Sequence, residues 1–137
     1  MNELDDCILF LLAKAYQRVY GNFKKRLQPY GLTPVQHLVL LSLSLDEGIS
    51  PGELGRRLIL DNATLSGILD RLVDGGWIVK QSSNEDKRSL KLFLTGKGRD
   101  GIEVLQRESD DANSRVLDIF GMEERILLKR FLKDLQQ

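Results

Sequence analysis

Residues 61–74 combine side chains that can hydrogen-bond to a ligand with side chains that can form a core. The leucines and the isoleucine of this segment recur at three- and four-residue steps, which places them on one face of a helix. Small polar side chains then lie on the opposite face and its flanks, open to a docking molecule. At 100° per residue the opposite face carries Ala63, Ser66, Gly67, Asp70 and Asp74, with Thr64 and Arg71 on one flank.

A cationic pair follows further along the chain, between two predicted strands. Residues 77–81 and 90–94 are rich in strand-forming side chains, and residues 82–86 have the composition of a turn. Lys87 and Arg88 come directly after that turn. From Lys87 to Arg99 the chain has five basic side chains and no acidic one, so positive charge is concentrated after the predicted turn.

Helices with recognisable first residues must position these side chains. Segment 33–36 supplies a capping threonine, a proline at the first helical position and a glutamine three residues after the cap, and segment 50–53 repeats the pattern. Either Asp61 or Asn62 caps the next helix, and the glycine pair 75–76 stops it. In chain order, the predicted helices cover 4–27, 34–45, 51 to about 60, 62–74, a long segment after Thr95 and a last segment after Gly121.

The order of elements predicts a mainly α fold with a small β-hairpin, since helix, tight turn, helix and hairpin together make a winged helix-turn-helix. The charge distribution agrees. The chain has 20 basic and 20 acidic side chains, but residues 50–99 hold nine basic and six acidic ones, while residues 100–137 hold six and nine. The zero total excludes a protein that coats polyanions along its whole surface. The local surplus favours attraction of phosphate at one place.

The first helix and the last two carry apolar stripes without an evident core of their own. The same helices of a second copy are the simplest cover, which predicts a two-fold homodimer. The chain also has 42% apolar residues but no long apolar run, which excludes a disordered chain and a membrane-spanning one. With a single cysteine, no signal peptide and no multi-cysteine metal pattern, we expect a cytoplasmic protein without cofactor or metal.

Several motifs in the correct order resemble the multiple-antibiotic-resistance regulator (MarR) family over essentially the whole chain. They are Gly31-Leu-Thr-Pro-Val-Gln, Asp61-Asn-Ala-Thr-Leu-Ser-Gly-Ile-Leu-Asp-Arg-Leu, Gly75-Gly-Trp-Ile, Glu85-Asp-Lys-Arg-Ser and Leu94-Thr-Gly-Lys-Gly. The resemblance implies a homodimeric transcriptional regulator, usually a repressor, whose DNA affinity falls when a small anionic or phenolic ligand, or an oxidant, acts on it. Residues 1–30 and 100–137 would be the dimerisation helices, and 31–99 the DNA-binding winged helix-turn-helix.

Residue by residue, the resemblance implies DNA contacts at Asn62, Thr64, Ser66 and Arg71, and a wing contact at Arg88 with Lys87 beside it. Many relatives have an arginine or lysine where this chain has Gly67, so one major-groove contact is missing here. His37 occupies a position that in this family often faces a cavity between the dimerisation and DNA-binding parts. Its candidate companions around an aromatic or anionic effector are Tyr16, Arg18, Tyr20 and Tyr30; ordinary helix packing is the alternative for the aromatic set.

Catalysis, protein binding and redox regulation are the alternatives to this function. Catalysis is not expected, because the chain has one histidine, no phosphate-binding glycine loop and no nucleophile elbow. A winged-helix module that binds another protein is possible, and salt-dependent duplex binding would separate it from a DNA-binding protein. A redox regulator could use Cys7, but a gap-free alignment puts the sensing cysteine of the peroxide-responsive branch at Leu9. Asp5 and Asp6 also oppose a Cys7 thiolate, so we expect an inert cysteine.

Overall fold

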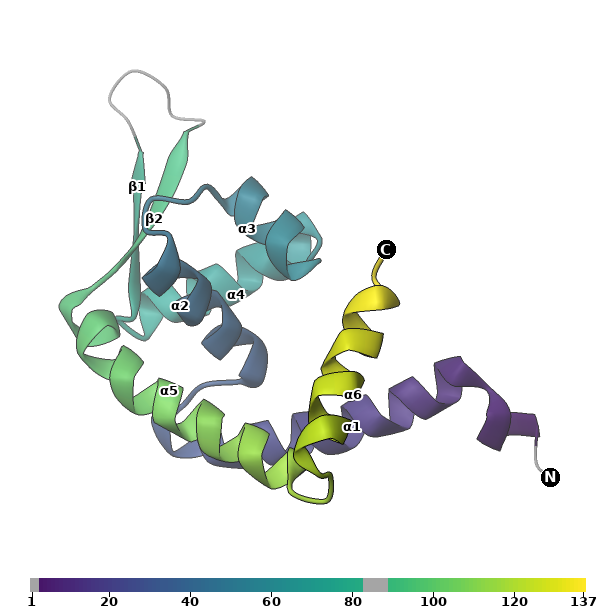
Figure 1. The fold of residues 1–137 in the computed structure, drawn as a ribbon. Helices are drawn as coiled ribbons and strands as arrows, with labels where there is room; N and C mark the ends of the chain where they lie inside the picture. Colours follow the sequence, from purple (N-terminus) through teal and green to yellow (C-terminus); the bar gives the residue numbers. More distant parts are fainter. Residues whose placement is uncertain (1–2, 83–88) are drawn as a thin grey trace.

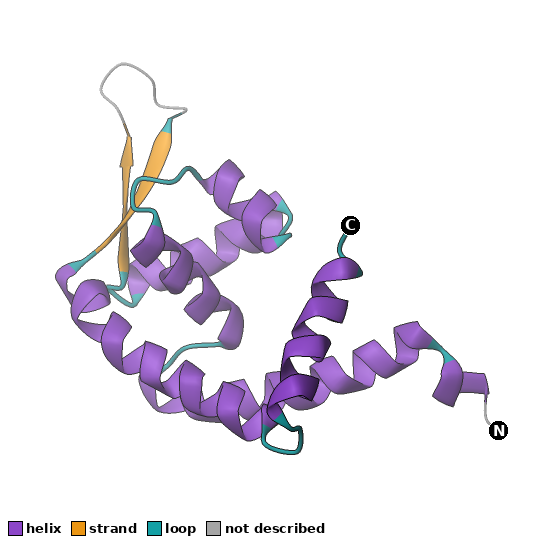
Figure 2. Cartoon of the chain, viewed as in Figure 1, coloured by secondary structure: helices purple, strands orange, loops and turns teal. Residues whose placement is uncertain are grey.

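The described residues, 3–82 and 89–137 of the computed structural model, form six α-helices and one two-stranded hairpin (Figures 1 and 2). The fold is therefore mainly helical with a small hairpin, as the sequence predicts. The elements are α1 (Ile8–Leu27), α2 (Pro34–Leu45), α3 (Pro51–Leu58), α4 (Asn62–Asp74), β1 (Ile78–Ser82), β2 (Leu90–Leu94), α5 (Gly96–Leu117) and α6 (Met122–Asp134), with 3₁₀ turns at Glu3–Asp6 and Gln28–Tyr30.

The predicted helix starts are largely confirmed. Thr33 forms the complete capping box with Gln36, whose backbone N–H donates to Thr33 Oγ1 at 3.2 Å and whose side-chain oxygen accepts from Thr33 N at 2.9 Å. Ser50 caps α3 by accepting from Glu53 N, but the Glu53 side chain does not return the bond recorded for Gln36. Asp61, and not Asn62, caps α4.

The first predicted helix and the first predicted strand differ slightly from the structure. A 3₁₀ turn and Cys7, an extended residue, precede α1, so the segment from Leu4 onward is not one continuous helix. Strand β1 begins one residue later than predicted, at Ile78. It pairs antiparallel with β2, from Ile78 opposite Leu94 to Ser82 opposite Leu90. Gly48 N and Ile49 O bond to the backbone of Leu92, so the α2–α3 link lies along the other edge of β2.

One buried cluster holds α2, α3, α4 and the hairpin together. It extends past both ends of the predicted 31–99 unit, because Leu27 from α1 and Leu105 from α5 belong to it. Each fully buried leucine contributes about 1.5–3 kcal/mol to folding. The buried apolar residues of the cluster are Leu27, Leu32, Val39, Leu40, Leu43, Ile49, Leu54, Leu65, Leu69, Leu72, Trp77, Ile78, Leu92, Leu94 and Leu105.

The first turn of α5 packs directly against Trp77. Thr95 caps α5 through Gly98 N, and its hydroxyl donates to Gly76 O at 2.5 Å. Lys97 Nζ lies 4.4 Å from the centre of the Trp77 ring and donates to Gly75 O at 2.8 Å. A Cβ at Gly98 would overlap the Trp77 carbonyl oxygen, so only glycine allows this approach. This contact joins α5 to the winged-helix unit, which is defined here as α2 to β2.

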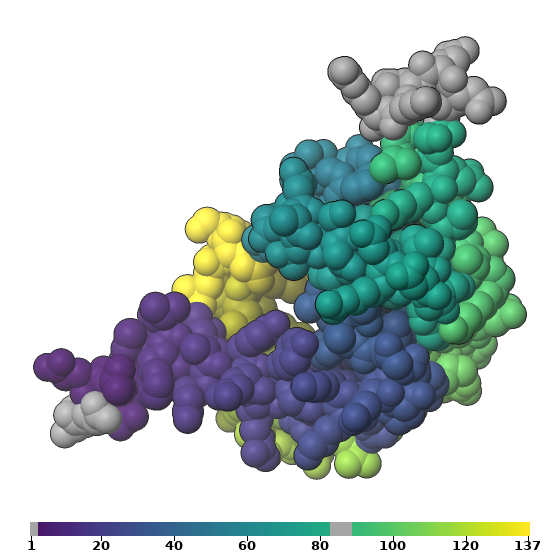
Figure 3. Space-filling view, turned by 180° about the vertical axis from the view of Figure 1, so that it is seen from behind, coloured from purple at the N-terminus to yellow at the C-terminus, as the bar shows by residue number. Residues whose placement is uncertain are grey.

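Helices α1, α5 and α6 lie on the side of the molecule away from the hairpin (Figure 1). α1 packs along α5. α6, in yellow in Figure 3, lies beside α1, where Leu132 borders a hollow with Leu12 and Tyr16. Apolar side chains on α1 and α6 are open to solvent in the single chain, including Ile8, Leu9, Leu11, Ile126, Phe131 and Leu135. No helix among residues 3–82 and 89–137 is both long and apolar enough to cross a membrane.

We predict that Gly98→Ala destabilises the fold by about 1–3 kcal/mol, because the added methyl forces α5 away from Trp77. Gly96→Ala is the matched control, since a Cβ there meets nothing within 4 Å. Urea unfolding followed by circular dichroism measures both variants. Equal stability of Gly98→Ala and Gly96→Ala would contradict the proposed role of this close approach.

Candidate nucleic-acid interface

The exposed side of α4 carries every polar residue predicted for it. Asn62, Thr64, Ser66 and Arg71 are all exposed, while Leu65, Leu69 and Leu72 are buried in the core. At about 100° per residue, Asn62 and Ser66 fall on one flank of the helix, and Thr64 and Arg71 on the other. The centre of the exposed face has the small residues Ala63 and Gly67, which let a docking partner approach the backbone closely.

The N-terminus of α4 is organised by the Asp61 carboxylate. Asp61 Oδ1 accepts from Thr64 N at 2.7 Å, and Oδ2 accepts from the Thr64 hydroxyl at 2.9 Å. The backbone bond from Thr64, followed by its side-chain bond, holds the pKa of Asp61 below its usual value of 3.8. Asp61 is therefore ionised at neutral pH, and its negative charge interacts favourably with the positive end of the helix dipole.

A groove lies between α4 and the hairpin, on the flank with Asn62 and Ser66. The ammonium group of Lys80 from β1 borders it and lies 2.7 Å from Asp70 Oδ1. Sequence reasoning did not single out Lys80, although alternation along β1 would have placed its side chain on a different face from that of Val79. The groove is lined by Pro51, Asn62, Leu65, Ser66, Leu69, Lys80 and Leu90.

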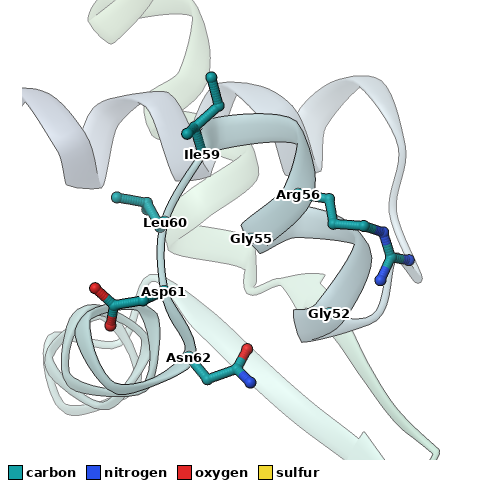
Figure 4. A pocket seen from close by; sticks show the side chains of 7 residues that line it. All are labelled: Gly52, Gly55, Arg56, Ile59, Leu60, Asp61 and Asn62. Atoms are coloured by element: carbon teal, nitrogen blue, oxygen red, sulfur yellow. The ribbon is translucent and has the colours of Figure 1, made fainter.

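A second hollow lies at the turn between α3 and α4 (Figure 4). The side chains of Arg56 and Asn62 project on the side of the turn where Gly52 lies, while the Asp61 carboxylate points the other way (Figure 4). Arg56 forms no ion pair with any described residue, whereas its neighbour Arg57 lies 3.2 Å from Asp46. Arg56 is thus a second cation that sequence reasoning missed, because only the folded turn places it beside α4.

The turn itself depends on two unusual backbone positions. A Cβ at Gly55 would lie 3.1 Å from Leu60 O, so glycine allows the chain to fold back tightly after α3. Ile59 adopts a left-handed conformation with φ of 56°, which is costly for a β-branched residue, and its side chain is 87% exposed. This geometry sets the angle between α3 and α4.

Lys87 and Arg88 lie outside the described residues. The structure describes the strand ends on either side of them, Ser82 of β1 and Leu90 of β2. Their contact with DNA stays a prediction from the sequence.

An apolar pocket of about 180 Å³ lies between α1 and α2. His37 is 2% exposed, and neither of its ring nitrogens has a hydrogen-bond partner among the described residues. Burial lowers the pKa of His37, so the imidazole is neutral in the folded protein. The pocket is lined by Tyr16, Val19, Tyr20, Phe23, Pro34, Val35, His37 and Leu38.

The structure thus brings together three of the five predicted effector residues, Tyr16, Tyr20 and His37. Arg18 and Tyr30 do not line this pocket. Tyr30 instead donates to Glu108 of α5 at 3.2 Å, in a network where Arg26 lies 3.1 Å from Asp111. This network fastens the end of α1 to α5.

The remaining candidate groups do not form a site in the described part of the chain. Cys7 is exposed and precedes the first residue of α1. Across residues 3–82 and 89–137, His, Cys, Asp and Glu side chains do not gather in a group of three or more that could hold a metal ion.

Comparisons with known proteins agree on one family. Residues 30–89 match the family model described as MarR family. The HTH-type transcriptional regulator SarZ of Staphylococcus saprophyticus is 30% identical over 135 residues, which are 97% of this chain and 90% of that protein. Similarity therefore extends over nearly the whole of both chains.

Solved structures show the same fold. The transcriptional repressor CouR bound to a 23-mer DNA duplex matches with a TM-score of 0.92 at 29% identity, over 100% of this chain and 97% of that one. A mutant MarR from E. coli complexed with operator DNA matches with a TM-score of 0.89 at 26% identity, over 100% of both chains. A MarR family protein of Mycobacterium tuberculosis in complex with salicylic acid matches with a TM-score of 0.74 at 27% identity, over 94% and 96%.

We predict that His37 makes folding sensitive to pH in a defined window. The unfolded imidazole takes up a proton as pH falls through 6.5, but the buried one does so only at lower pH. The free energy of unfolding therefore falls between pH 6.5 and the lower pKa of the folded state, and is unaffected by His37 above this window. His37→Leu should remove this fall.

The test is urea unfolding of wild type and His37→Leu between pH 7.5 and 5.5. A difference between the two proteins in this pH range can be assigned to His37, because the chain has one histidine. The same pH dependence in both proteins would show that folding does not lower the pKa of His37.

Proposed function

Because the chain belongs to the MarR family of transcriptional regulators, we propose that two copies bind one duplex operator and repress transcription until a small ligand enters. Like its relatives, the chain is a transcriptional regulator and not an enzyme. The homodimer, the residues that touch DNA, repression and release by ligand are parts of the proposal. Repression is supported by the match to CouR, a transcriptional repressor.

One observation carries the DNA-binding part. α4 exposes small polar side chains beside a hairpin, in a fold that matches two chains solved in complex with DNA over 97% and 100% of their lengths. In this arrangement α4 enters the major groove with Asn62, Thr64 and Ser66 toward base edges, and Arg71 toward phosphate. Arg88 at the wing reaches the neighbouring minor groove, and Lys87 a phosphate.

The surroundings of α4 add two cations to this interface. Arg56 lines the hollow at the turn and Lys80 lines the groove beside the hairpin, and Asn62 lines both. A phosphate backbone that follows this flank of the inserted helix would meet these cations. Arg56 has no acidic partner to give up among the described residues, whereas Lys80 must exchange Asp70 for phosphate.

The dimer part rests on exposed apolar surface. Leu9 is 75% exposed and Ile126 is 63% exposed in the single chain, and similar side chains continue along both α1 and α6. Such surface on terminal helices is covered when two copies interlock, with residues 1–30 and 100–137 forming the dimer and 31–99 the DNA-binding units. The two copies of α4 would then lie about 34–36 Å apart and match half-sites one helical turn apart on a pseudo-palindromic operator.

The effector part rests on the pocket between α1 and α2. Its walls are aromatic and aliphatic, and the unpartnered nitrogens of His37 give a bound ligand a hydrogen-bonding group. This composition suits a small aromatic compound with a hydroxyl or acidic substituent. A ligand held there would change the angle between α1 and the winged-helix unit, and so misplace both copies of α4 on the operator.

We predict that Arg88→Ala weakens operator binding by about 1–3 kcal/mol, because it removes the wing contact. The operator is first recovered by selection of bound fragments from genomic DNA, and affinity is then measured by fluorescence anisotropy between 50 and 300 mM salt. Wild-type affinity should fall steeply with salt as counterions return to the phosphates.

Lys24→Ala is the matched control, since it removes one positive charge from the last turn of α1. It should leave affinity and salt dependence unchanged. Unchanged binding by Arg88→Ala would contradict the wing assignment. Absence of saturable duplex binding by wild type, even at low salt, would overturn the DNA-binding proposal and favour a protein-binding module.

We predict that salicylate, used as a probe, weakens operator binding by wild type and has little effect on His37→Leu. Coupling between sites is reciprocal, so operator DNA should weaken salicylate binding by the same factor. Calorimetric titration of the protein with salicylate, in the presence and absence of operator, measures this factor. His37→Leu must first bind operator as wild type does, and equal salicylate affinity in both titrations would contradict release by this class of ligand.

A further inference from the structure

The Thr64 hydroxyl is held in one orientation on α4. We propose that Thr64 meets operator DNA as a hydrogen-bond acceptor only, and therefore selects an amino base, adenine or cytosine, over a keto base, guanine or thymine, in each half-site. This inference rests on the proposed function, because it requires α4 to enter the major groove.

Two bonds to Asp61 determine the orientation. The backbone N–H of Thr64 donates to Oδ1 at 2.7 Å, and Thr64 Oγ1 lies 2.9 Å from Oδ2. An ionised carboxylate has no proton to donate, so the hydroxyl must be the donor in the second bond. The same two bonds lower the pKa of Asp61, which keeps the carboxylate ionised throughout the neutral range.

A hydroxyl that has donated its proton can offer only lone pairs to a third group. Phosphate oxygens also only accept, so Thr64 would have to break its charge-assisted bond to Asp61 in order to bind one. Donors in the major groove are the amino groups at N6 of adenine and N4 of cytosine. Guanine and thymine present carbonyl oxygens at the corresponding edge. The exposed Thr64 hydroxyl thus matches the amino bases.

The neighbouring polar side chains do not have this restriction. The Ser66 hydroxyl forms no hydrogen bond with the described residues, so it is free to donate or accept, and the Asn62 amide contains both kinds of group. Thr64 is the member of this set whose hydrogen-bonding polarity is determined before DNA arrives. Asp61 is its positioning residue.

Asp61→Asn is the substitution that removes this restriction. Asparagine caps helices about as well as aspartate, so its side-chain oxygen still accepts from Thr64 N. Its NH₂ group then lies where Oδ2 was and donates to Thr64 Oγ1. The O–H bond of Thr64 is then free to turn toward DNA, and the hydroxyl can donate as well as accept through its remaining lone pair. The variant should therefore lose the wild-type preference for an amino base at this position and accept a keto base there as well.

The first experiment is selection from a pool of random duplexes by wild type, Asp61→Asn and Thr64→Val, with Ser66→Ala as the control. Thr64→Val keeps the shape of the side chain but removes the hydroxyl, so its effect on the selected bases identifies the position that Thr64 contacts. Wild type should select adenine or cytosine there, Asp61→Asn should accept amino and keto bases alike, and Thr64→Val should show no preference between the two classes. Ser66→Ala should keep the wild-type preference at this position.

The second experiment removes the amino group from the wild-type operator. If the contacted base is adenine, it is replaced by purine without the N6 group; if it is cytosine, it is replaced by the pyrimidinone without the N4 group. Loss of one hydrogen bond should weaken wild-type binding by about 2- to 10-fold per half-site and leave Thr64→Val unchanged. This comparison does not need Asp61→Asn, so it tests the acceptor role of Thr64 even if that variant fails to fold.

The outcomes distinguish failure of this inference from failure of the proposed function on which it rests. Guanine or thymine at the Thr64-sensitive position, no position sensitive to Thr64→Val, or an unchanged preference in folded Asp61→Asn overturns the acceptor role while DNA binding stands. Failure of wild type to bind any duplex in saturable fashion overturns the proposed function itself. Circular dichroism and thermal unfolding establish that each variant compared is folded.

Discussion

The close contact between the first turn of α5 and Trp77 determines how the two halves of the molecule meet. Gly98 and Gly101 lack the side chains that would collide with Trp77, and Thr95 and Lys97 bond to the carbonyls of the turn before β1. α5 leaves this contact as a long helix and leads into α6. A small change in its angle at Trp77 would therefore move the far end of α5 by a larger distance.

The electrostatics of α4 depend on its neighbours more than on the total charge of the protein. The chain is neutral, with 20 basic and 20 acidic side chains. Arg56 and Lys80 nevertheless border the Asn62 end of α4 from α3 and from β1, while Asp61 bonds inward to its own helix. Beside Asn62, Arg56 is thus a cation without an acidic partner among the described residues, whereas Lys80 is paired with Asp70.

Local features of the fold could be predicted because their causes lie within a few residues. The capping threonine with its glutamine, the proline after the cap and the apolar period of α4 depend on neighbours in the chain, and the structure confirms them. The sequence could not distinguish between capping residues of nearly equal preference. Asp61 and Asn62 both cap helices well, and whether Glu53 completes a capping box depends on its surroundings.

The class of fold, the exposed face of α4 and the family follow from the sequence alone, because periodicity, caps and ordered motifs are properties of the chain. Tertiary structure decided which distant groups meet. It placed His37 with Tyr16 and Tyr20 but left Arg18 and Tyr30 outside their pocket, since Glu108 of α5 engages Tyr30. It also brought Arg56 and Lys80 to α4. Sequence spacing cannot supply such pairs, because they depend on how helices cross in space.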